Sequence, residues 1–159
     1  NQNLLKISKK IKKITSKNRV KFLINDKPIV AKQANADGCH IGQKDFDIKK
    51  ARKILKNKIL GVTCHNSISL SQKAIENGAD YIALGAFFQS KTKKVKYFAN
   101  FHTLRSVKKF SKTDVVAIGG INLRNYKKVL LNKANFLAIS NYIWKNKTLN
   151  PEEALNKLK

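Results

Sequence analysis

The sequence has 159 residues, of which 42% are hydrophobic, so it is long enough to bury one sizeable core. We therefore expect a single domain over residues 1–159. No stretch approaches the roughly 20 uninterrupted apolar residues of a membrane helix, and residues 1–13 lack the apolar core of a secretory signal. These features argue against a membrane protein and predict a cytoplasmic one.

The formal net charge is +25, from 34 Lys and Arg residues against 9 Asp and Glu residues. Such an excess is typical of proteins that bind nucleic acid. However, the lysines are scattered through nearly every segment, and arginine, which makes bidentate contacts to bases and phosphates, occurs only as Arg19, Arg52, Arg105 and Arg124. We interpret the charge as a solvated lysine coat and expect no nucleic-acid partner. A basic nucleic-acid-binding protein remains the alternative from another functional class.

The two cysteines, Cys39 and Cys64, stand within or beside apolar runs. Neither has the close Cys or His neighbours of a zinc site. We predict that both are free, buried thiols.

The chain begins with an amphipathic helix over Leu4–Ile14, where Leu4, Ile7, Ile11 and Ile14 share one stripe with lysines opposite. A helix lying on a membrane surface is the alternative interpretation.

From residue 20 onward a short apolar run alternates with a longer stretch of helical spacing. The apolar runs, which predict strands, are Val20–Ile24, Gly38–Ile41, Ile59–Val62, Tyr81–Leu84, Val115–Ile118 and Phe136–Ile139. The predicted helices are Pro28–Asn35, Ile48–Leu55, Ser69–Asn77, Leu104–Phe110, Leu123–Leu131 and Pro151–Leu158. Asn150 is the expected N-cap of the last helix, with Pro151 at its first position.

This alternation indicates an α/β fold with a parallel sheet covered by helices. Similar corners precede three strands, at residues 35–38, 77–80 and 132–135, and no Gly-x-Gly-x-x-Gly follows the first strand. Both observations favour a (β/α)₈ TIM barrel, which has eight strand-helix units. About six units are present, so we expect the first two strands to be missing from this chain.

The active site of such a barrel lies where its strands end, and every predicted strand here ends in polar or glycine residues. Asp26 and Asp45 follow consecutive strands, and carboxylate oxygens beside substrate phosphates are ligands that Mg²⁺ prefers. The alternative is that Asp26 starts a turn and Asp45 caps the helix at Ile48. Together, at matching positions, they favour a magnesium site.

Phosphate-binding features follow three later strands. The segment 90–94 combines hydroxyl groups with lysines, and Gly119-Gly120 would let backbone N–H groups approach a phosphate closely, with Ser140 at the same corner. A tight turn is the alternative for the two glycines. His65 is a candidate acid or base, or it makes a turn hydrogen bond. We expect His40, in a strand, and His102, in a loop, to be structural.

The ordered set of these segments resembles the thiamine-phosphate synthase family over about Val20–Trp144. The matching segments are Leu23–Asp26, Asp37–Asp45, Gly61–Asn66, Gly78–Ile82, Thr92–Lys94 and Ala117–Ile121. The resemblance implies a (β/α)₈ barrel that uses Mg²⁺ to join hydroxymethylpyrimidine pyrophosphate to thiazole phosphate, releasing pyrophosphate.

The resemblance also implies roles for individual residues. Asp26 and Asp45 would be the metal ligands, and Lys93 would contact the pyrophosphate. Asn25 and Thr63 would contact the pyrimidine pyrophosphate, so that Lys93 and Thr63 are the expected catalytic residues. The thiazole phosphate would be bound by Ser90, Lys91, Thr92, Gly120, Ile139 and Ser140.

The chain departs from the family pattern at several places. Lys44 stands where an acidic residue is usual, residues 86–89 replace a proline-containing run, and residues 95–100 replace a glycine-bearing acidic loop. The family's Gln-x-Arg-x-Lys segment is not in this chain.

The nearest alternative is a thiazole tautomerase, which has the same barrel but needs no Mg²⁺. Asn25-Asp26, Asp45 and Thr92-Lys93 favour the synthase. The sequence gives no indication of the oligomeric state.

Overall fold

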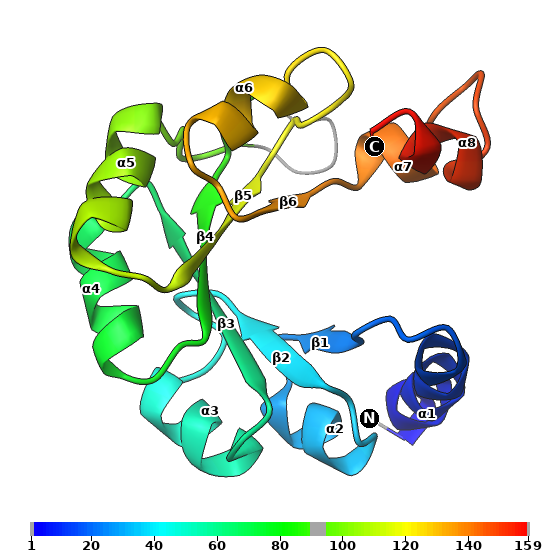
Figure 1. Ribbon diagram of the computed structural model, residues 1–159. Coiled ribbons are helices and arrows are strands. Elements are labelled where there is room, and N and C mark those ends of the chain that lie inside the picture. The colour runs from blue at the N-terminus through cyan, green and yellow to red at the C-terminus, as the bar shows by residue number, and fades with distance from the viewer. Residues whose placement is uncertain (1, 90–94, 159) are drawn as a thin grey trace. The chain divides into compact units, whose positions relative to one another are not determined.

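The computed structural model describes residues 2–89 and 95–158 and has the predicted α/β character. Its strands form one six-stranded sheet in chain order, β1 to β6 (Figure 1). The strands are β1 (Leu23–Asn25), β2 (Gly38–Ile41), β3 (Ile59–His65), β4 (Tyr81–Gly85), β5 (Asp114–Ile118) and β6 (Phe136–Ala138). The helices are α1 (Gln2–Lys17), α2 (Pro28–Gln33), α3 (Ile48–Leu55), α4 (Ile68–Glu76), α5 (Phe101–Phe110), α6 (Tyr126–Leu131), α7 (Asn141–Trp144) and α8 (Pro151–Asn156).

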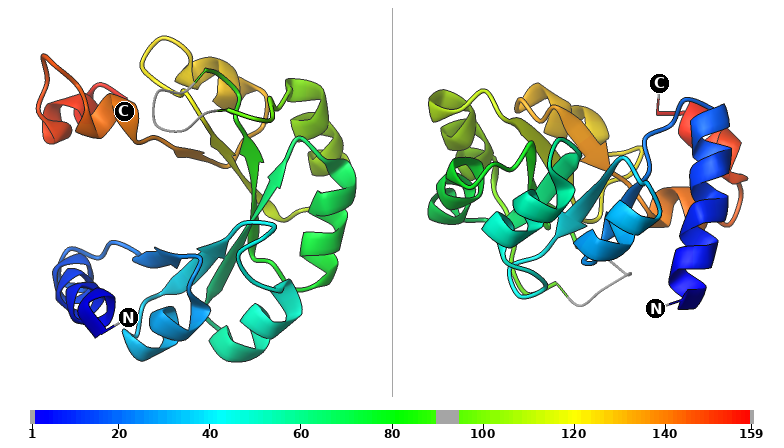
Figure 2. Two further views of the ribbon diagram at one scale, coloured as in Figure 1. Left: turned by 180° about the vertical axis from the view of Figure 1, so that it is seen from behind. Right: turned by 90° about the horizontal axis from the view of Figure 1, so that it is seen from below.

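The chain divides into two compact units, residues 1–63 with 72–82 and residues 64–71 with 83–159. In the first unit β1 pairs with β2, and β2 with β3, both in parallel. Helix α2 packs on β1, β2 and α3, and α3 packs on β2 (Figure 2). The core of this unit consists of alternate strand residues with little or no exposure, among them Ile24, Cys39, Ile41, Leu60 and Val62. The side chains of the intervening strand residues, including His40 and Thr63, project from the other face of the sheet.

Helix α1 confirms the predicted amphipathic helix, and its apolar stripe is 36% to 63% exposed. An ion pair links this helix to the rest of its unit, because Lys12 Nζ lies 2.7 Å from Asp37 Oδ2. The same carboxylate oxygen accepts a hydrogen bond of 2.8 Å from the N–H of Phe22. Asp37 therefore joins α1 and the segment before β1 to the corner that precedes β2.

Replacing Asp37 with asparagine is expected to lower the free energy of unfolding at pH 7 by about 1–2 kcal/mol. Burial acts to raise the pKa of Asp37, but the hydrogen bonds from Lys12 and Phe22 and the Lys12 charge outweigh it and lower the pKa below 3.8. The carboxylate thus stabilises the fold above the unfolded-state pKa, and this contribution is lost as the pH falls through the folded-state pKa. Urea unfolding from pH 7 to pH 2 should show the difference between the two proteins shrinking in acid. In a Lys12→Gln background the substitution should cost less, and an equal cost there would show that the ion pair contributes nothing.

In the second unit β5 pairs with β6 in parallel, from Val116↔Phe136 to Ile118↔Ala138. Helix α7 packs on α8, and the two lie side by side in Figures 1 and 2. The expected cap of α8 is confirmed, because Asn150 and Glu153 form a reciprocal capping box with Pro151 in the first turn. The fully buried side chains of this unit include Leu84, Leu104, Val107, Val115 and Val129.

The bounds of several elements differ from the sequence predictions, and strand β3, for example, continues to His65 instead of ending at Val62. Strand β1 begins at Leu23 because Val20 follows Arg19, which has a φ of 56°, and is itself 55% exposed. His102 lies in α5, not in a loop, because Asn100 caps that helix by accepting from the Thr103 N–H. The short helix α7 was not predicted, and α6 begins at Tyr126 instead of Leu123.

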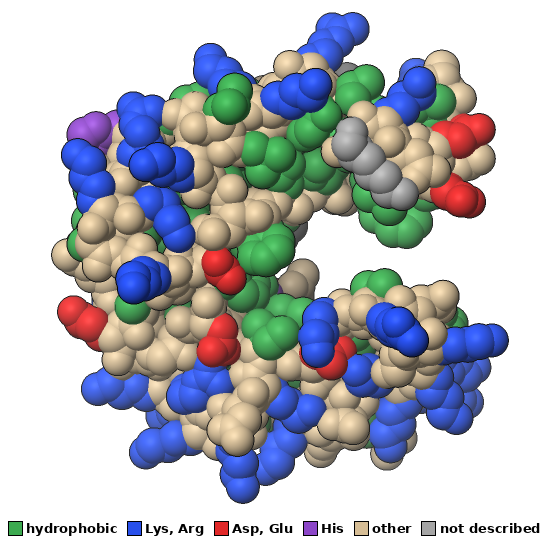
Figure 3. Space-filling model, viewed as in Figure 1, with side chains coloured by type: hydrophobic (Ala, Val, Ile, Leu, Met, Phe, Trp, Pro, Cys, Tyr) green, Lys and Arg blue, Asp and Glu red, His purple; other side chains and the backbone are tan. Residues whose placement is uncertain are grey.

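Basic side chains are spread over several helices on the face of the molecule that Figure 3 shows. Figure 3 shows Lys and Arg over helices α1 to α3 and also over α5 and α6. Within residues 2–89 and 95–158, no helix combines the length and the apolar character that crossing a membrane requires.

Candidate active site

The first group of predicted site residues lies where β1 and β2 end. Asn25 is the last residue of β1 and pairs with His40 of β2. Asp26 follows with a φ of 65°, and its N–H donates a hydrogen bond of 2.7 Å to the His40 carbonyl. The left-handed conformation, which aspartate tolerates better than most residues, fixes Asp26 at the carboxyl end of the sheet.

Asp45 lies in the loop after β2, and its carboxylate turns back toward the strand end. Its Oδ2 accepts a hydrogen bond of 2.9 Å from the Gly42 N–H. A Cβ atom at Gly42 would lie 2.4 Å from that oxygen, so the approach requires glycine. The alternative that Asp45 caps the following helix is wrong, because the N-cap of α3 is Asp47, whose side chain accepts from the Lys50 N–H.

Thr63, near the end of β3, is held through its side chain and its backbone. Its Oγ1 lies 2.8 Å from Nε2 of His40, whose Nδ1 lies 2.8 Å from the hydroxyl of Tyr81. The Gln43 side-chain amide donates to the Thr63 carbonyl. Burial lowers the pKa of His40 in spite of the Asp45 charge and raises the pKa of Tyr81 to about 12, which favours a neutral imidazole beside the Thr63 hydroxyl and a neutral phenol beyond it.

The second group lies where β5 and β6 end. Ile118↔Ala138 is the last pair in register, so Gly119-Gly120 and Ile139-Ser140 follow it directly at one edge of the sheet. Gly119 and Gly120 have φ values of 99° and 65°. The Gly120 carbonyl accepts from the side-chain amides of Asn122 and Asn125, at 3.1 and 3.0 Å. These two asparagines were not predicted, although Asn-x-x-Asn after a glycine pair is a recognisable turn signal.

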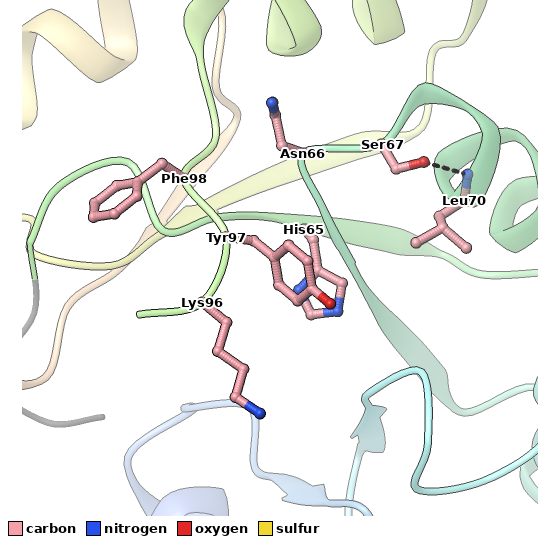
Figure 4. A pocket seen from close by; sticks show the side chains of 7 residues that line it. All are labelled: His65, Asn66, Ser67, Leu70, Lys96, Tyr97 and Phe98. Atoms are coloured by element: carbon pink, nitrogen blue, oxygen red, sulfur yellow. Dashed lines mark hydrogen bonds between the residues drawn. The ribbon is translucent and has the colours of Figure 1, made fainter. Parts of the chain in front are cut away.

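A pocket of about 470 Å³ lies at the end of β3 and is lined by His65, Asn66, Ser67, Leu70, Lys96, Tyr97 and Phe98 (Figure 4). The His65 and Tyr97 rings contact each other there, with centroids 4.6 Å apart. Ser67 Oγ accepts from the Leu70 N–H at the start of α4, and Asn66 Oδ1 accepts from the Asn100 N–H. Burial lowers the pKa of His65, which favours a neutral imidazole in this pocket.

The remaining predicted residues can be placed only in part. Ser90, Lys91, Thr92 and Lys93 lie outside the residues that the structure describes. Among residues 2–89 and 95–158, no group of three or more His, Cys, Asp or Glu side chains could hold a metal ion. Cys39 and Cys64 are buried thiols outside any disulfide, as predicted, and burial raises their pKa to about 11 and about 12.

A family model described as thiamine monophosphate synthase matches residues 1–143. The chain belongs to this family. Its members are transferases of thiamine biosynthesis.

Two curated relatives show how far the family resemblance extends. The thiamine-phosphate synthase of Pelagibacter ubique (strain HTCC1062) is 67% identical over 159 residues, which is 100% of this chain and 77% of that protein. The thiamine-phosphate synthase of Alcanivorax borkumensis is 49% identical over 105 residues, which is 65% of this chain and 48% of that protein. Neither match favours the tautomerase or the nucleic-acid alternative.

A solved structure of the family has the same fold. The thiamine phosphate pyrophosphorylase from Pyrococcus furiosus superposes with a TM-score of 0.88 at 27% identity, covering 99% of this chain and 74% of that chain. The parallel α/β fold of this family is therefore confirmed for the chain.

The structure links several of the site residues that the family resemblance implied. The His40 carbonyl accepts a hydrogen bond from the Asp26 N–H, and the His40 ring is hydrogen-bonded to the Thr63 hydroxyl. Gly120 and Ser140 follow paired strands in the other unit. Sequence reasoning missed His40 and Tyr81 as partners of a site residue.

Proposed function

We propose that the chain joins hydroxymethylpyrimidine pyrophosphate to thiazole phosphate and releases pyrophosphate. The 67% identity over all 159 residues to a thiamine-phosphate synthase carries this proposal. We further propose that the six strands form part of an eight-stranded (β/α) barrel in a cytoplasmic enzyme.

Two carboxylates, those of Asp26 and Asp45, would hold Mg²⁺. Asp26 and Asp45 follow paired parallel strands, and both are exposed. Mg²⁺ is commonly bound by one or two carboxylates together with substrate phosphates, whereas zinc sites are usually built around Cys and His side chains. A donor set of two oxygen side chains therefore fits magnesium. When bound, Mg²⁺ would supply positive charge to the pyrophosphate oxygens.

The chain's own residues would bind and orient the two substrates. In the first unit Asn25 and Thr63 would contact the pyrimidine pyrophosphate. In the second, Gly120, Ile139 and Ser140 would bind the thiazole phosphate, since the partly exposed edge after β5 and β6 offers backbone groups close to a positive-φ glycine. Ser90, Lys91 and Thr92 are proposed to complete that site, with Lys93 on the pyrophosphate.

The reaction exchanges one bond for another at the methylene carbon of the pyrimidine. The bond from the methylene carbon to the pyrophosphate oxygen breaks, and the thiazole nitrogen forms the new bond to that carbon. Negative charge grows on the departing pyrophosphate, so Lys93 would bind the transition state more tightly than the ground state. Little acid or base catalysis is needed, because no proton is transferred at the reacting carbon.

The protein should release pyrophosphate only when both substrates and Mg²⁺ are present. The measurement is a coupled pyrophosphate assay, with each component omitted in turn. Product formation without Mg²⁺ would contradict the magnesium requirement, and conversion of thiazole phosphate alone to a tautomer, without pyrophosphate release, would favour the tautomerase instead. A binding assay with duplex DNA at about 150 mM salt serves as a control, where we expect no binding.

A further inference from the structure

Three neighbouring strands place a histidine and a tyrosine on either side of a glycine. His40 on β2 pairs in register with Gly61 on β3. A Cβ atom at Gly61 would lie 2.0 Å from Cζ and 2.3 Å from the hydroxyl oxygen of Tyr81. Because glycine has no side chain, the Tyr81 ring passes over β3 and stacks on His40, with the ring centroids 5.5 Å apart and the planes at 22°.

The same histidine reaches Thr63, which lies two residues beyond Gly61 and so projects from the same face of β3. Both nitrogens of the imidazole are engaged, with the Tyr81 hydroxyl at 2.8 Å from Nδ1 and Thr63 Oγ1 at 2.8 Å from Nε2. The three polar groups therefore form one continuous chain, Tyr81 to His40 to Thr63. Of these three groups, the Thr63 hydroxyl is the one that lies at the carboxyl edge of the sheet.

The direction of this chain decides what the Thr63 hydroxyl can do. A neutral imidazole has one donor nitrogen and one acceptor nitrogen. A phenol is more acidic than an alkyl hydroxyl and is the better donor, so the Tyr81 O–H should donate to Nδ1. The proton of His40 then resides on Nε2 and is donated to Thr63 Oγ1. The hydroxyl proton of Thr63 is left to point elsewhere, toward an acceptor.

We propose that Tyr81 and His40 are positioning residues, which commit the Thr63 hydroxyl to donate its proton to an anionic oxygen of the pyrimidine pyrophosphate. This inference rests on the proposed function, which places Thr63 at that substrate. The opposite tautomer would make Thr63 donate to His40 and present lone pairs to the anion, which would repel it.

The kinetic test uses Tyr81→Phe, which removes one hydroxyl and keeps the ring over Gly61. We expect kcat for pyrophosphate release to fall about tenfold, equivalent to the loss of one hydrogen bond in the network, with the KM for thiazole phosphate little changed and the urea midpoint lowered by the loss of that hydrogen bond. Tyr126→Phe, which removes a phenol from α6, is the matched control and should keep full activity.

A double-mutant cycle separates this role from a general structural one. Thr63→Val should lower kcat more than Tyr81→Phe, and Thr63→Ser should restore what valine loses. Adding Tyr81→Phe to Thr63→Val should cause no further loss, because Tyr81 acts only through the threonine hydroxyl. If Tyr81→Phe lowers kcat by the same factor in both backgrounds, or not at all in the parent protein, the positioning role is refuted.

A second measurement does not depend on activity. Nitrogen NMR of the protein labelled at its three histidines reports the tautomer of each ring, and His40→Gln assigns the His40 signals. We expect the Nε2–H tautomer at His40, lost or mixed in Tyr81→Phe. An Nδ1–H tautomer would overturn the proposal even in an active enzyme. An inactive parent protein with the expected tautomer would instead count against the proposed function alone.

Discussion

Replacing Asp45 with asparagine is expected to lower kcat/KM for pyrophosphate release about 1000-fold, or about 4 kcal/mol in transition-state stabilisation. The amide oxygen of asparagine can still accept the hydrogen bond from the Gly42 N–H, so the loop after β2 should keep its shape. The neutral amide is a much weaker ligand for Mg²⁺ than a carboxylate. Initial rates over a range of Mg²⁺ concentrations would measure the loss, and raising Mg²⁺ should recover part of it.

Asp47→Asn provides a matched control two residues away. It removes the same charge from the same loop, but asparagine is as good an N-cap as aspartate, so α3 should be unaffected. We expect its activity to stay within about twofold of the parent protein. Equal losses in Asp45→Asn and Asp47→Asn would mean that Asp45 acts only through the general charge of the loop, and the magnesium role would be wrong.

Local sequence patterns predicted most of the fold because its elements have strong local signals. Strand Gly38–Ile41 and helix Ile48–Leu55 were predicted with the bounds that the structure has. Helix α6 was predicted to begin three residues early, at Leu123. The side chains of Asn122 and Asn125 bond to the backbone of residues 120, 122 and 124 and hold a turn there, which the apolar spacing of this segment does not reveal.

The site was predictable only where a residue's place at a strand end identifies it. The structure places Asp26 and Gly120 directly after strand ends, as this reasoning expected. The two aspartates of the loop after β2 could not be told apart by sequence, because Asp45 and Asp47 both precede a helix and only backbone geometry shows which one caps it. The contact of Tyr81 with His40 could not be predicted from the sequence either, since it depends on a glycine in the strand between them.

Replacing Gly120 with alanine is expected to lower the free energy of unfolding by about 2–4 kcal/mol and to raise the KM for thiazole phosphate about tenfold. The φ of Gly120 is 65°, a conformation that alanine adopts only at a cost of about 1–2 kcal/mol. The added Cβ would also lie 2.3 Å from the carbonyl oxygen of Gln89 and 2.7 Å from Cβ of Phe88, so the backbone must shift. Urea unfolding and steady-state kinetics would measure the two effects separately.

Gly78→Ala separates the conformational cost from the steric one. Gly78 has a φ of 85°, but the nearest atom to an added Cβ is Nε of Arg52 at 3.4 Å, which is an ordinary contact. Its unfolding free energy should therefore fall by only about 1–2 kcal/mol, with the KM for thiazole phosphate unchanged. Equal destabilisation by the two substitutions would show that the strand end relaxes around the Gly120 methyl group. A Gly120→Ala protein with an unchanged KM for thiazole phosphate would remove this corner from the substrate site, because the displaced backbone is the part proposed to bind the phosphate.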